Sequence, residues 1–198
     1  MNALLNGLRV IEFASDRAAW AGKLMGDLGA DVIVVEPPGG HASRSYGPFL
    51  DDKEDPDRCL WWWNYNTSKR SVVLDLQSDA GREQFRQLAA GADIVLEGED
   101  PGVLDALGID HTQIRASKPD LIWVSVTPLG RRCAELQEPA TDLTLLAGGG
   151  TVWSCGYDDH SLPPVRPGGG HAHHTASAFA VMAALTAVVH RDLTGIGQ

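Results

Sequence analysis

Apolar and polar positions alternate along this chain in short blocks that predict an α/β protein. The run LRVIEF (Leu8 to Phe13) is typical of a strand, and AAWAGKLMGDLG (Ala18 to Gly29) has helical spacing and ends in glycine. The run ADVIVVE (Ala30 to Glu36) is again typical of a strand. Strand, helix and strand therefore follow within about 30 residues, the length of a βαβ unit with a parallel strand pair.

The same alternation continues through the middle of the chain. A strand is predicted at RSVVLDL (Arg70 to Leu76), followed by a helix with Ser78 or Asp79 as its N-cap and by the strand DIVLEG. Two short helical stretches then precede a last strand in DLIWVSVTPLG. The pattern predicts an α/β domain with a mostly parallel sheet and its ligand crevice at the carboxyl ends of the strands.

The second and third predicted strands are joined by a segment of about 30 residues without clear periodicity, a length that is usually functional or disordered in a compact domain. It contains three consecutive tryptophans, Trp61, Trp62 and Trp63, whose large aromatic area favours burial. We expect them to pack in the core or in a subunit interface rather than to form a ligand-stacking platform.

A second conspicuous segment is TASAFAVMAALTAVV, from Thr175 to Val189, which is apolar on almost every face of a helix. Such a pattern predicts a helix buried on all sides. His190 and Arg191 supply a charged last turn, and Gly195 is a stop signal.

Composition narrows the possible partners. Of the 198 residues 26 are acidic and 16 basic, so the formal net charge is -10, and 43% are hydrophobic. This charge disfavours nucleic acid and anionic membrane surfaces as partners. The three separated cysteines fit neither a disulfide framework nor a zinc pair, and we find no export signal and no run of 18 apolar residues, so the expected compartment is the cytoplasm.

Three kinds of site are tested against the motifs. A dinucleotide site would use Glu36, but the turn ASDRAAWAG has no glycine where a pyrophosphate would approach the backbone. His171, His173 and His174, with His160 or Asp158, offer imidazoles for a metal, but their spacing does not by itself bring four ligands together, and we expect no metal. A serine hydrolase would need a G-x-S-x-G turn, which the chain lacks.

Several motifs in order resemble the class III CoA-transferases, the CaiB/BaiF family that includes formyl-CoA transferase and 2-methylacyl-CoA racemase. They are LNGLRVIEFASDRAAWAGKLMGDLGADVIVVEPPGG, NTSKRSVVLDLQSDAGREQFRQLAAGADIVLEGEDPGVLDALGI, KPDLIWVSVTPLG, ATDLTLLAGGG and TGIGQ. Family members are about twice this length, with a Rossmann-like large domain, a smaller second domain and two interlocked subunits. The resemblance implies that residues 1–198 are the N-terminal part of the large domain, either of a truncated chain or of a natural split or tandem protein.

The resemblance also implies a mechanism. In the family an aspartate near the start of the long apolar helix attacks an acyl-CoA thioester, forms a mixed anhydride, becomes an aspartyl-CoA thioester, and passes CoA to an acceptor carboxylate. Counted back from TGIGQ without a gap, that position is His173. An imidazole has no carbonyl to hold CoA, so the usual cycle cannot run through it. The racemase pair is also missing, because Thr141 and His173 stand at its positions.

Further departures imply weak CoA binding. The family's AGP turn is Ala18, Ala19 and Trp20 here, which places an indole where the CoA chain would approach, and the arginine of its ENFRPG motif is Asp100. The candidate CoA-binding residues that the resemblance leaves come from the first turn, the glycine pair and the NTSKR motif; they are Ser15, Arg17, Arg44, Asn66, Lys69 and Arg70. For Lys69 and Arg70, a solvated basic turn is an equally good account.

Three hypotheses follow. This half is a non-catalytic domain or subunit of a CoA-transferase, in a homodimer or with a family partner chain. Alternatively it binds acyl-CoA and runs altered acid–base chemistry with His173 or His174, or it is a purely structural interaction module with interfaces at the tryptophan run and the apolar helix.

Overall fold

In the computed structural model, residues 3–131, 140–155, 158–159, 161–163 and 165–198 are described. Five parallel strands form one sheet with the order β3-β2-β1-β4-β5. The strands are β1 (Arg9–Phe13), β2 (Asp31–Glu36), β3 (Lys69–Val73), β4 (Ile94–Glu97) and β5 (Ile122–Ser125). The α/β fold with a parallel sheet, which the sequence predicts, is confirmed.

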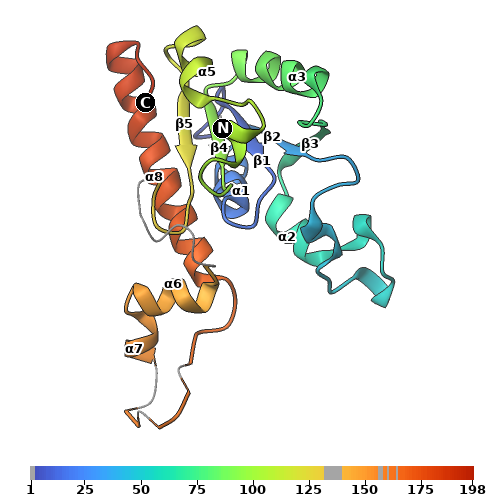
Figure 1. Cartoon of the computed structure of the whole chain (residues 1–198), viewed down its shortest axis with the longest axis vertical. Coiled ribbons are helices and arrows are strands. Elements are labelled where there is room, and N and C mark those ends of the chain that lie inside the picture. Colours follow the sequence, from blue (N-terminus) through green and yellow to red (C-terminus); the bar gives the residue numbers. More distant parts are fainter. Residues whose placement is uncertain (1–2, 132–139, 156–157, 160, 164) are drawn as a thin grey trace.

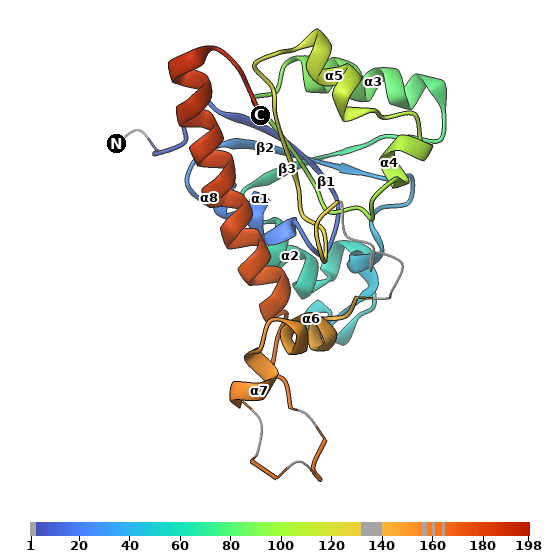
Figure 2. The same cartoon turned by 60° about the vertical axis from the view of Figure 1, so that its left-hand side comes forward.

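Helices cover both faces of the sheet, because every buried strand alternates its side chains between two apolar layers (Figures 1 and 2). Val10 of β1 packs with α1 (Ala19–Asp27) and α8 (His171–Thr194), whereas its neighbour Ile11 packs with the opposite layer. That opposite layer consists of α3 (Asp79–Ala90), α4 (Val103–Ala106) and α5 (His111–Ser117).

The segment between β2 and β3 forms ordered structure in which only part of the tryptophan run is buried. It contains three short 3-10 turns, η1 (Ala42–Ser45), η2 (Leu50–Asp52) and η3 (Pro56–Arg58), and the helix α2 (Leu60–Asn66). Trp62 packs in a small core with Cys59, whereas Trp61 is half-buried and Trp63 is exposed. Core packing is thus confirmed for Trp62, since one face of a short helix meets the core, and an interface at Trp61 and Trp63 stays a prediction.

Two short helices, α6 (Asp142–Gly148) and α7 (Thr151–Cys155), extend away from the sheet below the first turn of α8 (Figure 1). The periodicity of the sequence predicted neither, because each is too short to show a repeating apolar face. After α8 the chain returns to the sheet, where the Trp123 amide of β5 donates to the Gln198 carbonyl at 2.8 Å.

The prediction that the apolar helix is buried on all sides is wrong for this chain. One side of α8 packs on α1 and β5 through Val181, Ala184 and Ala187. The other side is uncovered, with Phe179 64% and Leu193 82% exposed. By length and composition alone α8 could cross a membrane, and the contact of its buried side with the sheet is that of a core helix.

Candidate functional site

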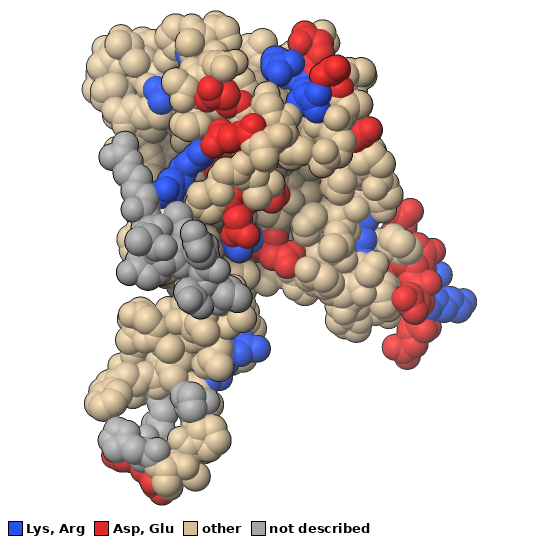
Figure 3. All heavy atoms as spheres, viewed as in Figure 1, with Lys and Arg blue, Asp and Glu red and all other residues tan. Residues whose placement is uncertain are grey.

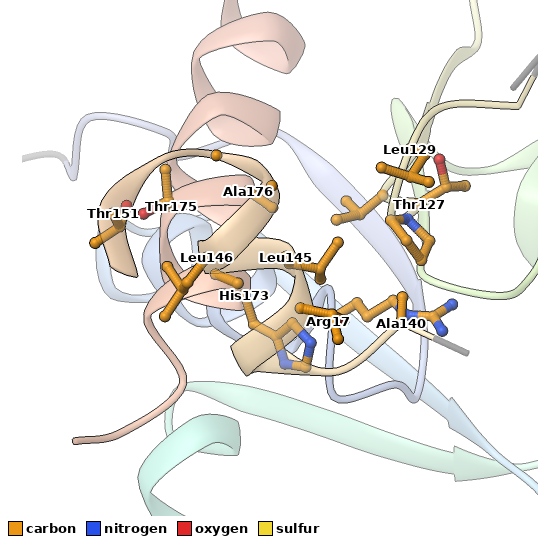
Figure 4. A pocket seen from close by; sticks show the side chains of 16 residues that line it. Arg17, Thr127, Leu129, Ala140, Leu145, Leu146, Thr151, His173, Thr175 and Ala176 are labelled. Atoms are coloured by element: carbon orange, nitrogen blue, oxygen red, sulfur yellow. The ribbon is translucent and has the colours of Figure 1, made fainter. Parts of the chain in front are cut away.

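An open pocket with chemically useful groups lies where α8 begins, beyond the carboxyl end of β5. Its volume is about 740 Å³, within the range of about 300 to 1,000 Å³ that is usual for small-molecule sites. The walls come from the β1–α1 turn, the segment after β5, α6 and the first turn of α8 (Figure 4). Figure 4 shows His173 and Arg17 next to each other on one side of this pocket.

The first turn of α8 is held in place by Asp142, the first residue of α6. One oxygen of this carboxylate accepts a hydrogen bond from the Ala172 amide at 2.9 Å, and the other lies 3.0 Å from Nη1 of Arg166. An anion at a helix N-terminus is stabilised by the unpaired amides and the helix dipole. Asp142 therefore fixes the direction in which the histidines of α8 point, a role that the sequence motif ATDL alone did not reveal.

His173, the first predicted catalytic residue, lines the pocket. Burial lowers the pKa of His173, and the nearby charges of Asp142 and Asp16 oppose this shift, whereas Arg17 and His174 add to it. The imidazole is consequently neutral at pH 7, with no hydrogen-bond partner among the residues that the structure describes. It can act as a proton acceptor or a hydrogen-bond donor toward a molecule in the pocket.

His174, the second predicted catalytic residue, points away from this pocket into an aromatic cluster. Its Nε2 lies 2.7 Å from the Tyr65 hydroxyl, and its ring centroid is 4.8 Å from that of Trp20. Burial lowers the pKa of His174, and the neighbouring His171 adds to this effect. Sequence reasoning missed Tyr65, because it lies on α2, more than 100 residues before its partner.

Arg17, a predicted CoA-binding residue, lines the pocket beside His173 and is 23% exposed. Its Nη1 donates to the Gly98 carbonyl at 3.1 Å and to Oδ1 of Asp100 at 2.7 Å. The anion that replaces the family's arginine is thus paired with a cation from the neighbouring turn, a compensation that only the folded chain brings together. Ser15, also predicted to bind CoA, is buried instead, and its hydroxyl accepts a hydrogen bond from the Ala18 amide at 3.2 Å.

Acidic groups dominate the sheet edge around this turn. Burial raises the pKa of Glu99, and the negative charges of Glu97 and Asp100 raise it further, against an opposing effect of Arg17. Figure 3 shows acidic side chains around the hollow in the middle of this face. A polyanionic ligand such as CoA meets an unfavourable field here.

Arg44, predicted to bind CoA, forms an internal ion pair with Glu36 at the end of β2. Its Nε and Nη2 lie 2.6 and 2.8 Å from the carboxylate oxygens of Glu36, and its guanidinium stacks over the Trp62 ring at 4.1 Å. Burial alone would raise the pKa of Glu36, but hydrogen bonds from Arg44 and Ser71 outweigh it, so the net pKa is lowered. Because Arg44 contacts both oxygens of Glu36, this carboxylate is not available to bind the ribose of a dinucleotide.

Lys69, a further predicted CoA-binding residue, forms a buried ion pair with Glu12 of β1 and donates a hydrogen bond to Asn66, another of them. Nζ of Lys69 lies 2.9 Å from Oε1 of Glu12 and 3.0 Å from Oδ1 of Asn66, and the Lys69 side chain is 1% exposed. Arg70 binds both oxygens of Asp31 at the opposite, amino end of the strands. The structure therefore does not bring Arg44, Asn66, Lys69 or Arg70 to the walls of the pocket beside His173, and their contact with CoA stays a prediction.

The three clustered histidines do not converge on a common point. The ring centroids of His171 and His174 are 6.3 Å apart, and His173 points into the pocket. Within the described ranges, the one group of ligand atoms close enough to share an ion is Asp105, Asp110 and His111, whose atoms lie within 4.8 Å of one another. Of the suggested extra ligands, Asp158 is exposed, and His160 lies outside the described residues.

The fold and this site define a class of protein: a Rossmann-like α/β domain whose pocket lies at the start of a long apolar helix. The family model described as CoA-transferase family III matches residues 5–198. The chain therefore belongs to CoA-transferase family III, as the sequence motifs predicted.

Known relatives carry related activities. The chain is 36% identical over 190 residues to the succinyl-CoA:(R)-benzylsuccinate CoA-transferase subunit BbsE of Thauera aromatica, covering 96% of this chain and 46% of that protein. It is 34% identical over 199 residues to a succinyl-CoA:mesaconate CoA-transferase of Haloarcula hispanica, covering 98% of this chain and 50% of that protein. The chain thus spans about half the length of the curated relatives it matches.

A solved structure extends the likeness to three dimensions. A CaiB/BaiF family protein from Brucella suis is 32% identical and superposes with a TM-score of 0.89 over 100% of this chain and 52% of that chain. The agreement in fold confirms the predicted family, and the chain covers about half of that solved chain. That it is the N-terminal part of the large domain stays a prediction.

Proposed function

We propose that the protein carrying this chain transfers CoA between an acyl-CoA and a carboxylic acid, and that this half is its non-nucleophilic part. One observation carries the proposal: among the described residues that line the pocket at the start of α8, none has a carboxylate, and His173 faces the cavity. Asp142 of α6, whose carboxylate contacts that turn, is held by Arg166 and the Ala172 amide.

The chemistry explains why this observation matters. In the covalent relay a carboxylate oxygen attacks the thioester carbon and expels CoA thiolate, giving a mixed anhydride. The thiolate then attacks the enzyme's own carbonyl carbon, releasing the first acid and leaving an enzyme-bound thioester. The acceptor acid reverses both steps, so that the enzyme carboxylate is regenerated. His173 can accept an acyl group on nitrogen, but it offers no carbonyl carbon for the thiolate.

We infer that a partner chain of the same family supplies the carboxylate. The relative from Thauera aromatica and a succinyl-CoA–L-malate CoA-transferase relative from Chloroflexus aurantiacus are both named as subunits. The uncovered side of α8, with Phe179, Met182 and Val189 exposed, is an apolar surface of the kind that a subunit interface buries. A second family chain that carries the carboxylate would cover it.

The test measures CoA transfer from succinyl-CoA to a carboxylic acid, with the full-length protein carrying this chain alone and together with a carboxylate-bearing family chain encoded beside it. We expect activity only in the mixture, since only the partner has the nucleophile. Equal activity of the protein alone would overturn the proposal.

The variant His173→Asp examines the same site directly. If the pocket beside α8 still admits CoA, the restored carboxylate produces transferase activity without the partner; if Trp20 and Asp100 keep CoA out, it does not. His171→Asp is the matched control, because it adds the same charge to the same helix turn outside the pocket lining.

A second candidate function, acid–base chemistry on an acyl-CoA, rests on the 2.7 Å contact between Nε2 of His174 and the Tyr65 hydroxyl. A neutral imidazole paired with a phenol can take up a proton and pass it on. Exchange of the α-proton of acetyl-CoA with deuterated water, abolished in Tyr65→Phe and His174→Gln, would support this function. If neither proton exchange nor CoA transfer is observed, with the protein alone or in the mixture, the remaining hypothesis is the purely structural interaction module.

A further inference from the structure

The guanidinium of Arg17, which lines the pocket, has hydrogen-bonding capacity left. Both of its side-chain hydrogen bonds to described residues, to the Gly98 carbonyl and to Asp100, use Nη1. Nε and Nη2 have no partner within the described part of the chain. These two groups form the fork that binds both oxygens of a carboxylate in parallel.

The rest of the pocket is suited to an apolar group. Val126, Leu129, Leu145 and Leu146 line it from the segment after β5 and from α6 (Figure 4). His173 adds an uncharged imidazole, because burial lowers its pKa. Arg17 is therefore the single charged side chain among the described residues of the lining.

We propose that this pocket binds a carboxylate with an apolar body, such as an aryl- or alkyl-substituted acid, with its carboxylate on Nε and Nη2 of Arg17 and its body against Leu129, Leu145 and Leu146. The inference rests on the proposed function, since such an acid is the kind of molecule that accepts or releases CoA. It goes further by assigning a ligand to the half that lacks the nucleophile.

Charge favours this occupant over CoA itself. One carboxylate adds a single negative charge beside a guanidinium that already pairs with Asp100, whereas CoA would add several phosphate charges near Glu97, Glu99 and Asp100. Asp100 does not compete for the fork, because it is 64% exposed and contacts only Nη1. The volume of about 740 Å³ leaves room for a ring or a short chain.

The test is calorimetric titration of the protein, without CoA and without a partner, with three probes: 3-phenylpropionate, its uncharged amide and acetate. We expect 3-phenylpropionate to bind at least tenfold more tightly than the amide, which lacks the charge for Arg17, and than acetate, which lacks the apolar body. Arg17→Met should weaken 3-phenylpropionate binding about 10- to 100-fold and leave amide binding within about twofold.

Arg86→Met is the matched control, since Arg86 is a partly exposed arginine on α3, outside this pocket, and its loss should leave binding unchanged. Leu145→Asn should weaken binding through the apolar wall while Arg17 stays in place. The inference is wrong if 3-phenylpropionate and its amide bind equally, if neither binds, or if Arg17→Met binds the acid like the parent. The first two results are measured on the parent protein and do not depend on whether a variant folds.

The same titration separates this inference from the proposed function. Transfer activity in the mixture combined with absent acid binding would refute only the pocket assignment. Selective acid binding combined with full transferase activity of the protein alone would refute only the non-nucleophilic role.

Discussion

At the residue scale, two buried carboxylates are each held by one cation from elsewhere in the chain. Glu12 of β1 pairs with Lys69, and Glu36 of β2 pairs with Arg44. Removing one partner of a buried pair leaves the other charge uncompensated, which destabilises proteins by about 3 to 5 kcal/mol. Lys69 and Arg44, which the resemblance gave as candidate CoA-binding residues, therefore neutralise buried carboxylates in this structure.

The first prediction concerns Gly22 on α1. A Cβ at this position would collide with Oε2 of Glu12 inside the buried pair, so Gly22→Ala should lower the free energy of unfolding by about 1 to 3 kcal/mol. Urea denaturation measures the change. Gly148→Ala is the control, because a Cβ there meets open space in the last turn of α6, and it should stabilise or be neutral. Equal effects of the two variants would contradict the prediction.

The second prediction concerns the pH dependence of stability. Burial raises the pKa of Glu12 from 4.5 to about 7, although Lys69 opposes the shift. The folded protein thus keeps a proton that the unfolded chain releases, so the contribution of Glu12 to stability is complete below pH 4.5 and is lost as the pH rises through about 7. The stability difference between Glu12→Gln and the parent should therefore shift in favour of the variant over this window. A difference that stays constant from pH 4.5 to 7.5 in denaturation experiments would show the expectation to be wrong.

At the element scale, the two sides of α8 differ: one side packs on the sheet, and the other side exposes apolar side chains. Its buried side closes the sheet through Val181, Ala184 and Ala187, and its first turn presents His173 and His174. The uncovered side carries an apolar stripe at helical spacing: Phe179, Met182, Val189 and Leu193. The larger part of each of these side chains is not covered by the described residues, and we infer that a partner chain packs on the stripe.

The third prediction tests that separation of roles. Phe179→Glu should leave the thermal midpoint almost unchanged, because a surface substitution alters stability by about 0.5 kcal/mol or less. Association with the partner chain, measured by analytical ultracentrifugation, should weaken at least tenfold, since the charge would have to be buried in the interface. Val73→Glu is the control, because Val73 is 55% exposed on β3, at the edge of the sheet opposite to β5, on which α8 packs; its association should be normal. Normal association of Phe179→Glu would exclude this face as the interface.

At the scale of the whole molecule, the distribution of charge disfavours the binding of polyanionic ligands. The net charge is -10, and acidic groups gather at the carboxyl edge of the sheet, where a Rossmann-like protein places its ligands. The few cations of the candidate site are engaged in internal pairs. An anionic ligand thus binds this half only where a fork such as that of Arg17 remains open.

The fourth prediction follows from this field. Asp100→Asn should raise the affinity of the protein for CoA about fivefold at low salt, because one unit charge at close range is worth about 1 kcal/mol in water. Calorimetry with CoA measures it, and Asp192→Asn, which removes an exposed charge at the far end of α8, should have no effect. A lower affinity in Asp100→Asn would mean that Asp100 helps to position Arg17 for CoA.

Much of the fold could be predicted from the sequence because each strand and each longer helix carries its own periodic pattern. The strands from Arg9 to Ser125 lie where the apolar runs predicted them. Helices α6 and α7 were missed because a few residues show no period, and the burial of α8 was overestimated because an apolar sequence does not say which side is covered. The candidate site was predicted in part: His173 and Arg17 line one pocket, whereas His174, Lys69 and Arg44 bind other residues.

The sequence by itself determined the α/β class and the family, because these depend on local patterns and on the order of motifs. It also predicted that His173 stands where the family has its aspartate. Only the tertiary structure decided which charges are free and which are neutralised. Glu12 and Lys69 are 57 positions apart, and Arg17 and Asp100 are 83 apart. Whether a cation binds a ligand or a buried carboxylate depends on its neighbours in space, which no local pattern specifies.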